Sequence, residues 1–506
     1  MTEPQVYLVG AGPGHPGYLT LRAVECLARA DLVLYDRLVA TSILEHAPRA
    51  ERICVNELAS AHIQRSREIH KLMIDRARAG QCVVRLKGGD PHVFGRAGEE
   101  AEALSQAGIS YEIVPGVTAI LGAAACTGIP LTHRAHASGF VVVTGHEDAC
   151  KGESAVDWAW LARFPGTLIV YMGMAHLEKI VNDLLAHGKG PDTPAAAVHW
   201  ATTNRQRTVV STLAGLPAAV QDRGLAAPAL LLIGPVVSLR ERLDWFEKRP
   251  LFQQRILVTR PRHQVSDLVH ELELAGATPL VLPAVAIQDP PDWSVVDRAL
   301  RALGSYQWLV FTSANGVDYL LGRLGKLGLD LRQLGGIKLA AIGPATAEAL
   351  ARFHLRADLV PAEYRSETLA AELKEQVRGQ RVLLARADRG RELLRDELQE
   401  VAQVEQIAVY SQVDALDRSS PEFAQVCRGE IDWVTLTSSN IARAVLGALD
   451  EPARAHIKAG RVRLASISPV TSATIAELGL PVHAEAKEYT SPGLVAALVR
   501  ANREGG

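Results

Sequence analysis

The chain has 506 residues, 48% of them hydrophobic and 22% charged, so we expect a globular protein of two or more domains, each with its own core. Its 54 basic and 56 acidic residues give a net charge of −2, which provides no overall positive field and excludes nucleic acid as an expected partner. No uninterrupted apolar run approaches the ~20 residues that a membrane helix requires, so no membrane partner is expected either.

Short apolar runs that favour β-strands alternate with amphipathic helical stretches along the chain, and this alternation predicts an α/β architecture. The pattern is interrupted around residues 240–254 by a charged stretch with a proline, which we interpret as a domain junction. In the first half, strands are expected at residues 6–9, 31–35, 82–86, 111–114, 140–144, 167–171, 195–199 and 229–233.

The first strand leads into the loop VGAGPGHPGYLTL at residues 9–21, whose glycines satisfy the G-x-G-x-x-G pattern of a dinucleotide-binding loop. The next strand ends at Asp36, where such a site has a ribose-binding acid. Pro13 and Pro16 argue against this interpretation, because a pyrophosphate loop works through backbone N–H groups and proline has none. The pattern by itself leaves the ligand of this loop open.

Turn-forming clusters follow several other expected strands of the first half. One strand runs into KGGDP at residues 87–91, a turn whose glycines allow a ligand to approach the backbone closely. Clusters of Gly, Pro and Thr follow in VPGVTA (114–119), GIPLTHR (128–134) and VVVTGH (141–146). Open α/β sheets bind ligands at the carboxyl ends of their strands, so we expect a ligand site here.

The second half contains an internal repeat. WLVFTSAN at residues 308–315 recurs as WVTLTSSN 125 residues later, and IGPAT at residues 342–346 recurs as ISPVT at the same offset. RILVTR at residues 255–260 corresponds to RVLLAR 126 residues later. A period of this length indicates two similar α/β lobes and not a solenoid.

Each repeat ends one strand in a Thr-Ser pair and a later strand in Pro-x-Thr at the start of a helix. Hydroxyl and free N–H groups at such positions can form an anion-binding rim, and two facing rims would suit a large polyanionic ligand. Helix capping is the commoner role of Ser and Thr and is favoured for any single one of them. The duplicated set as a whole favours a ligand site.

The first half carries six motifs in a fixed order, namely GAGPG (10–14), LVLYDRLV (32–39), RLKGGDPHVFGR (85–96), VPGVTA (114–119), GIPLTHR (128–134) and YMGM (171–174). Together they resemble uroporphyrinogen-III C-methyltransferase over residues 5–248, and we take residues 1–248 as this domain. The resemblance implies two α/β subdomains that hold S-adenosylmethionine in a cleft, a fold different from the Rossmann methyltransferases. It also implies methylation of uroporphyrinogen III at C2 and C7, which gives precorrin-2.

Carried over motif by motif, the resemblance implies a cofactor site and a substrate site. Asp36 matches the family's proton acceptor, although its carboxylate could equally cap the following turn. Glu57 is a weak catalytic candidate, because it stands where some relatives carry a lysine suggested as proton donor, and His15 replaces the acid of the usual GAGPGD. The cofactor is expected to contact Pro13, Gly88, Gly89, Asp90, Val93, Thr118, Ala119, Met172 and Ala201. The candidate cations for the substrate carboxylates are Arg85, Arg96, His133 and Arg134.

The second half resembles uroporphyrinogen-III synthase through the TSAN-like and IGPAT-like pairs and their spacing. We take residues 251–506 as this domain, with lobe one formed by residues 251–287 and 413–503 and lobe two by residues 288–412. The resemblance implies that the linear tetrapyrrole hydroxymethylbilane binds between the lobes. Its cyclisation, with inversion of the fourth ring, would give uroporphyrinogen III without a cofactor.

The same resemblance suggests residues for this reaction. Tyr410 matches a family tyrosine thought to help the hydroxyl group leave, and its alternative role is that of a packed hinge aromatic. The substrate carboxylates are expected to bind to Thr312, Ser313, Thr346, Thr437, Ser438 and Thr471.

The two resemblances support each other, because the product of the synthase is the substrate of the methyltransferase. The expected partners are therefore tetrapyrroles, and a homodimer through the methyltransferase half is expected as well. Three alternatives stay open. The first is a nicotinamide dehydrogenase, which would need a G-x-G-x-x-G without prolines, and the chain contains none. The second is that the second half binds hydroxymethylbilane without turnover. The third is that the first half methylates a later corrin intermediate.

The six cysteines, at positions 26, 54, 82, 126, 150 and 427, include no C-x-x-C pair and lie mostly in apolar contexts. This distribution is typical of reduced core residues and predicts neither disulfides nor a metal site. The N-terminal residues run into the first strand without a charged leader. These features lead us to expect a cytoplasmic protein.

Overall fold

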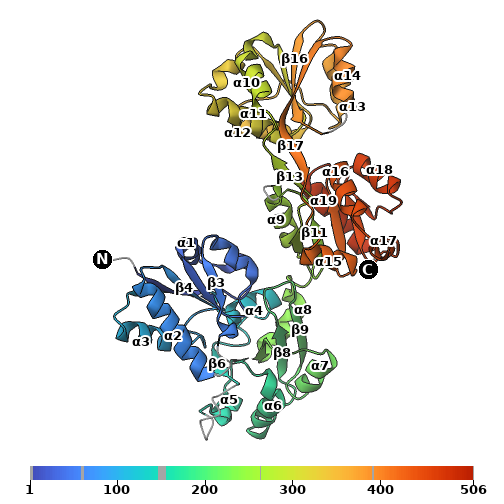
Figure 1. Ribbon diagram of the computed structural model, residues 1–506. Coiled ribbons are helices and arrows are strands. Elements are labelled where there is room, and N and C mark those ends of the chain that lie inside the picture. Colours follow the sequence, from blue (N-terminus) through green and yellow to red (C-terminus); the bar gives the residue numbers. More distant parts are fainter. Residues whose placement is uncertain (1–3, 59–61, 146–154, 262–263, 390–391, 505–506) are drawn as a thin grey trace. The chain divides into compact units, whose positions relative to one another are not determined.

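The computed structural model describes residues 4–58, 62–145, 155–261, 264–389 and 392–504 (Figure 1). The chain divides into two compact units, Met1–Phe252 and Gln253–Gly506. The division falls within the charged stretch that the sequence indicates as a domain junction.

The first unit begins with a parallel five-stranded sheet that has helices on both faces. Its elements in chain order are β1 (Val6–Gly10), α1 (Leu21–Arg29), β2 (Leu32–Tyr35), β3 (Glu51–Cys54), α2 (His62–Arg78), β4 (Val83–Lys87), α3 (Ala97–Gln106) and β5 (Tyr111–Val114). The strand order is β3-β2-β4-β1-β5. α1 packs on one face and α2 and α3 on the other, so β1 and β4 are buried throughout. Because all strands are parallel, their carboxyl ends, with the motif loops, lie at one edge.

A mixed five-stranded sheet completes the first unit. Its elements are α4 (Ala119–Thr127), β6 (Phe140–Thr144), α5 (Trp158–Arg163), β7 (Thr167–Tyr171), α6 (Leu177–Ala186), β8 (Pro194–His199), β9 (Arg207–Thr212), α7 (Leu216–Asp222), β10 (Ala229–Ile233) and α8 (Arg240–Leu243). The strand order is β6-β7-β10-β8-β9, with β6 and β7 parallel and the other pairs antiparallel. β9 is absent from the sequence-based strands, because its RTVVST has only two apolar residues.

The second unit contains two further five-stranded sheets. The first, in the order β12-β11-β18-β19-β20, consists of β11 (Arg255–Val258), β12 (Thr278–Val281), β18 (Trp433–Leu436), β19 (Arg463–Ser466) and β20 (Ala484–Glu485). The second, in the order β13-β17-β16-β14-β15, consists of β13 (Val285–Gln288), β14 (Trp308–Phe311), β15 (Lys338–Ala341), β16 (Arg381–Ala387) and β17 (Gln403–Asp414). The helices are α9 (Ser266–Leu274), α10 (Trp293–Arg301), α11 (Ala314–Lys326), α12 (Pro344–Arg352), α13 (Ser366–Lys374), α14 (Leu393–Gln399), α15 (Pro421–Cys427), α16 (Ser439–Gly447), α17 (Glu451–Lys458), α18 (Pro469–Glu477) and α19 (Ser491–Glu504).

The sequence repeat maps onto equivalent strands of these two sheets. β15, β14 and β16 of one sheet are adjacent in the same order as β19, β18 and β11 of the other. The chain passes between the sheets through β13 and β17, which pair antiparallel. The lobe boundaries expected after residues 287 and 412 both fall inside these two strands, which belong to the second sheet. The α/β class predicted from the sequence is confirmed.

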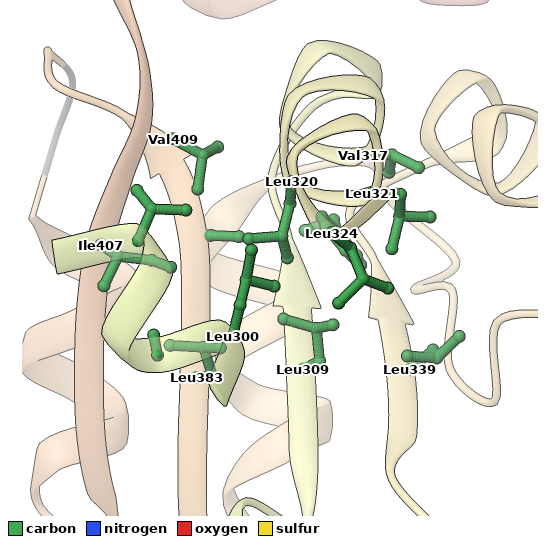
Figure 2. Packing of buried hydrophobic residues seen from close by; sticks show 14 of the residues in the cluster. Leu300, Leu309, Val317, Leu320, Leu321, Leu324, Leu339, Leu383, Ile407 and Val409 are labelled. Carbon is green, nitrogen blue, oxygen red and sulfur yellow. The ribbon is translucent and has the colours of Figure 1, made fainter. Parts of the chain in front are cut away.

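The core of the second sheet shows why α11 has a fixed position (Figure 2). Val317, Leu320, Leu321 and Leu324 recur at helical spacing and are buried against the strands. Burial of one such side chain stabilises the fold by roughly 1.5–3 kcal/mol. This packing holds the first turn of α11 at the carboxyl end of β14.

Five cysteines, Cys26, Cys54, Cys82, Cys126 and Cys427, carry free thiols, and Cys150 lies outside the described residues. Across the described part of the chain, no helix combines the length and the apolar character needed to cross a membrane.

Candidate functional site

The first backbone N–H groups of the loop after β1 are bonded within the protein. The N–H of Ala11 donates to the carbonyl of Lys87 (2.8 Å), and that of Gly12 donates to the carbonyl of Gly89 (3.1 Å). In return, the N–H of Gly89 donates to the carbonyl of Gly12 (2.7 Å). The next residue, Pro13, has no N–H. A pyrophosphate would find no donors at these positions, so the resemblance to a dinucleotide-binding loop does not extend to its chemistry.

His15, which stands where the resemblance leads us to expect an acid, caps the short helical turn Pro16–Tyr18. Its Nδ1 accepts the backbone N–H of Gly17 at 3.0 Å. Burial, assisted by the charge of Arg249, lowers the pKa of His15. The neutral imidazole therefore supplies the acceptor that a carboxylate would supply.

A cavity of about 790 Å³ lies at the carboxyl edge of the first sheet and is lined by residues of both sheets of the first unit. Such a volume suits a cofactor together with part of a substrate. All nine residues expected to contact the cofactor line this cavity, namely Pro13, Gly88, Gly89, Asp90, Val93, Thr118, Ala119, Met172 and Ala201.

Strained backbone is concentrated around this cavity. Phe94, Arg96, Met172 and Trp200 have positive φ angles of 56°, 60°, 53° and 45°, and all four line it. A non-glycine residue in this region costs roughly 1–3 kcal/mol and is retained mainly where the surroundings impose it for function. The wall of the cavity is therefore preorganised.

Side-chain hydrogen bonds hold the loops of the wall together. Both carboxylate oxygens of Asp90 accept backbone N–H groups, from His92 (2.8 Å) and from Gly116 (3.0 Å), so this side chain joins the loops after β4 and β5. The hydroxyl of Tyr171 bonds to Thr118 Oγ1 (2.7 Å) and accepts the N–H of Ile120 (3.2 Å), which joins β7 to the start of α4. Burial raises the pKa of Tyr171, so its hydroxyl stays protonated.

Asp36 is held by a buried arginine. Arg85 Nη2 donates to Asp36 Oδ1 at 2.6 Å, and Arg85 Nε donates to Glu100 Oε1 at 3.0 Å. Arg85 is only 3% exposed and also donates to the carbonyls of Leu34 and Leu86. The sequence suggested Arg85 as a ligand of substrate carboxylates, but its guanidinium is engaged inside the protein and orients Asp36.

The same network includes a buried lysine. Lys87, 3% exposed, donates to Glu100 Oε1 at 2.8 Å, and Glu100 Oε2 has no hydrogen-bond partner among the described residues. Burial and the neighbouring Arg85 lower the pKa of Lys87, while Glu100 opposes this effect. Two cations and two carboxylates, with Asp36 nearest the surface, thus form a charge-balanced cluster in the cavity wall.

The cations at the cavity differ in part from those expected. Arg96 lines the cavity and is exposed, with Glu99 at 2.5 Å. Arg37 and Arg65 also line it, and the only sequence signal for either of them was the place of Arg37 in the YDRLV motif.

Three expected residues lie away from the cavity. His133 and Arg134 are exposed in a turn and do not line it. Glu57 is exposed and does not line it either, whereas its neighbour Asn56 does and accepts the backbone N–H of Arg37 at 2.8 Å.

In the second unit, the duplicated serines cap helices. Ser313 Oγ accepts the N–H of Gly316 (3.0 Å) at the start of α11, and Ser438 Oγ accepts the N–H of Ile441 (3.2 Å) at the start of α16. Thr346 and Thr471 are only 3% and 2% exposed, which disfavours direct contact with a ligand. The other expected carboxylate ligands, Thr312 and Thr437, are half-buried.

Tyr410 lies in β17 beside one of these caps. Its hydroxyl is 3.0 Å from Ser313 Oγ, and the side chains of Asn315 and Gln412 lie close enough to affect its pKa. Burial raises the pKa of Tyr410, and the side chains of Ser313, Asn315 and Gln412 oppose that rise. The sequence singled out Tyr410 and Ser313 separately, and the fold brings them into contact.

Two amide residues around Tyr410 are themselves held in place. Gln264 Nε2 donates to Asn315 Oδ1 at 2.7 Å, and Asn440 Nδ2 donates to Gln412 Oε1 at 3.1 Å. Asn315 and Asn440 end the two copies of the Thr-Ser-x-Asn motif, which was the available signal for them.

The chain consists of two α/β units, the first with a ligand-sized cavity, and comparison with known proteins gives the family. Residues 5–217 match the model of the Tetrapyrrole (Corrin/Porphyrin) Methylases, and residues 266–496 match that of Uroporphyrinogen-III synthase HemD. The chain is 33% identical to Porphyrin biosynthesis protein HemD of Ruminiclostridium josui over 453 residues, 88% of this chain and 89% of that protein. It is 38% identical to Uroporphyrinogen-III C-methyltransferase of Bacillus subtilis (strain 168) over 358 residues, 71% of this chain and 72% of that protein.

Among solved structures, Uroporphyrin III C-methyl transferase of Thermus thermophilus is 42% identical, with 46% of this chain and 94% of that chain covered and a TM-score of 0.40. The chain belongs to the family in which a uroporphyrinogen-III C-methyltransferase is fused to a uroporphyrinogen-III synthase. It is a bifunctional enzyme of tetrapyrrole biosynthesis.

Proposed function

We propose that the second unit cyclises hydroxymethylbilane to uroporphyrinogen III and that the first unit methylates this product at C2 and C7 with S-adenosylmethionine, giving precorrin-2. The observation that carries the proposal is the cavity of the first unit, which nine expected cofactor residues and Asp36 all line. The family membership of both units supports it, because one reaction makes the substrate of the other.

The residues of the cavity fit S-adenosylmethionine. Pro13, Val93 and Met172 offer apolar contacts to an adenine ring, and Asp90 places negative charge near a cationic sulfonium. When bound, the cofactor supplies the methyl group that a nucleophilic pyrrole carbon attacks. The positive φ angles around the cavity and the hydrogen bonds between its loops hold these side chains in place.

Asp36 acts as the proton acceptor of the methyl transfer. After the pyrrole carbon has gained a methyl group, the macrocycle must lose a proton, and Asp36 presents a carboxylate at the cavity to take it. The alternative role, capping of the following turn, is filled by its backbone, since the carbonyl of Asp36 accepts the N–H of Val39 at 2.9 Å. Arg85 orients the carboxylate, and its own position is fixed by Glu100.

The substrate carboxylates bind to arginines at the cavity. Uroporphyrinogen III carries eight carboxylates, which need cationic partners. Arg37 and Arg96 are exposed at the cavity and Arg65 is half-buried there, so these three side chains can reach a substrate that covers the opening.

In the second unit, the proton of Tyr410 assists departure of the hydroxyl group of hydroxymethylbilane. The phenol stays protonated at neutral pH because burial raises its pKa, and the carboxyl end of β14 lies beside it. Loss of water leaves an electrophilic methylene carbon that the fourth ring attacks during closure.

The purified chain is tested by incubation with hydroxymethylbilane, with and without S-adenosylmethionine, followed by separation of the tetrapyrroles. We expect uroporphyrinogen III without the cofactor and precorrin-2 with it. Formation of the type I isomer alone would show that the second unit only binds tetrapyrroles. Unmethylated type III product in the presence of the cofactor would refute the methyltransferase assignment, and a control with added uroporphyrinogen III tests that unit alone.

We further propose that the first unit forms a homodimer and that the enzyme acts in the cytoplasm, where its free thiols stay reduced. Light scattering on the purified chain measures the mass of the assembly, and a monomeric mass at micromolar concentration contradicts the dimer.

A further inference from the structure

Tyr410 cannot hand its proton directly to a substrate that binds outside the core, because it is only 3% exposed. A proton donor must lie within about 2.6–3.2 Å of the acceptor or act through an intermediate hydroxyl or water. Ser313 Oγ is 3.0 Å from the phenol oxygen and belongs to a half-buried residue at the carboxyl end of β14, where ligands of such sheets bind.

Either hydroxyl can be the donor in the hydrogen bond between Tyr410 and Ser313, and the amides around Tyr410 favour donation by the phenol. Asn315 accepts the N–H of Gln264 through its carbonyl oxygen, which leaves its NH₂ group for other acceptors, and its side chain lowers the pKa of Tyr410 as a donor does. Gln412 likewise accepts from Asn440 and presents its NH₂ group. Two donor groups beside the phenol oxygen interact with its lone pairs, which directs the phenol O–H toward Ser313.

The lone pairs of the Ser313 hydroxyl can be assigned in the same way. Its oxygen accepts the N–H of Gly316 at 3.0 Å, and when it also accepts the O–H of Tyr410 its two lone pairs are filled. The hydroxyl hydrogen of Ser313 is then free to point toward a ligand. A continuous path of hydrogen bonds thus runs from the buried phenol to the carboxyl end of β14.

We propose that Ser313 relays the proton of Tyr410 to the leaving hydroxyl group of hydroxymethylbilane, an inference that rests on the proposed function of the second unit. The Ser313 hydrogen moves to the hydroxyl oxygen, the carbon–oxygen bond breaks, and water leaves with the bonding pair while the pyrrole nitrogen lone pair forms the azafulvene cation. The Tyr410 proton moves to Ser313, and the amides of Asn315 and Gln412 stabilise the phenolate. Ring closure releases one proton, which returns along the same path.

Ser313 also caps α11, so its replacement needs a control for lost capping. Ser420 provides this control, because its Oγ caps α15 by accepting the N–H of Phe423 at 3.2 Å. Threonine retains a hydroxyl and caps helices nearly as well as serine, so Ser313→Thr is the conservative variant.

The test compares the turnover of hydroxymethylbilane to the type III isomer, and its solvent deuterium isotope effect, among variants of the full chain. We expect Ser313→Ala and Tyr410→Phe each to lower kcat by about 10²–10⁴-fold, the usual contribution of a positioned acid. The double variant should be no slower than either single variant, and Ser313→Thr should recover activity. Ser420→Ala should lower Tm as much as Ser313→Ala does, but it should keep the wild-type kcat and isotope effect.

Two results separate the relay from the role of Tyr410. If Ser313→Ala keeps a kcat close to that of Ser420→Ala while Tyr410→Phe is slow, the relay is wrong and Tyr410 remains the acid. If Tyr410→Phe itself keeps the wild-type kcat, the proposed role of Tyr410 fails, and the relay fails with it.

Discussion

At the scale of single residues, a buried network sets the position of the Asp36 carboxylate in the first unit. Asp36 is reached by Arg85, and Arg85 is held by Glu100 and by two backbone carbonyls. Burial works against the charge of Arg85, but the two carboxylates outweigh it and raise its pKa, so the guanidinium stays charged. A fixed proton acceptor is what a methyl transfer followed by proton loss requires.

Replacement of Asp36 by Asn tests this role. The amide has nearly the shape of the carboxylate but cannot accept a proton, so we expect the methylation rate to fall by about 10²–10⁴-fold with little change in the Kd of S-adenosylmethionine. Initial rates with uroporphyrinogen III and calorimetric titration with the cofactor measure the two quantities. An unchanged rate would assign the proton to another group.

His15 predicts a pH dependence of stability. Its folded pKa is lowered by burial, below the ordinary value near 6.5, so the unfolded chain binds the proton more readily. Its contribution is present above pH 6.5 and is lost as the pH falls through the lowered folded pKa, because a protonated Nδ1 cannot cap Gly17. We expect His15→Asp to reduce the fall in Tm of the first unit between pH 7.5 and 5.5, and an equal fall in wild type and variant would contradict the capping role.

At the scale of elements, the position of α11 determines where Ser313 meets Tyr410. The helix is fixed by its apolar face on the second sheet of the second unit, with Leu320 and Leu324 fully or nearly fully buried (Figure 2). The tyrosine lies on β17, between β13 and β16 in the sheet, and its ring packs against Tyr319 of the same helix. Loosening of the helix would therefore weaken the contact between the two hydroxyls.

Leu320→Ala tests this packing. We expect a loss of about 2–5 kcal/mol in the free energy of unfolding, because the substitution leaves a cavity under the helix. Leu274 in α9 is 60% exposed, and Leu274→Ala should change the same quantity by no more than about 0.5 kcal/mol. Urea unfolding measures both variants, and equal losses would show that α11 does not depend on this core.

Motif spacing predicts which loops line the cavity better than it predicts which side chains bond to each other there. Gly88, Gly89 and Thr118 follow apolar strands, and parallel strands bring such loops to one edge, so their common location was predictable. The burial of Arg85 was not predictable, because an arginine in a strand motif looks the same in the sequence whether it faces solvent or a buried carboxylate. Its partner Glu100 lies on a helix with no motif to connect the two.

The second unit shows the same limit. The repeat predicted two similar lobes, and the sheets have equivalent strand orders. The contact between Tyr410 and Ser313 joins residues 97 positions apart, and only the fold reveals it. Thr346 and Thr471 occupy equivalent positions of the repeat but are buried, so duplication alone did not separate ligand-facing from core hydroxyls.

At the scale of the whole molecule, two compact units joined between Phe252 and Gln253 carry the two activities. Each unit has its own sheets and its own core clusters. We expect residues 1–252 and 253–506, produced as separate chains, to fold and to keep methyltransferase and synthase activity respectively. Circular dichroism and the two separate assays check this, and loss of either activity on separation would show that the units depend on each other.

The most direct test of the account is the position of labelled carbon in the product that the full chain makes from hydroxymethylbilane and methyl-¹³C S-adenosylmethionine. The account predicts two labelled methyl groups, at C2 and C7 of a type III macrocycle, in the ¹³C NMR spectrum. Labels at other carbons, a single label in the final product, or a type I macrocycle would contradict it.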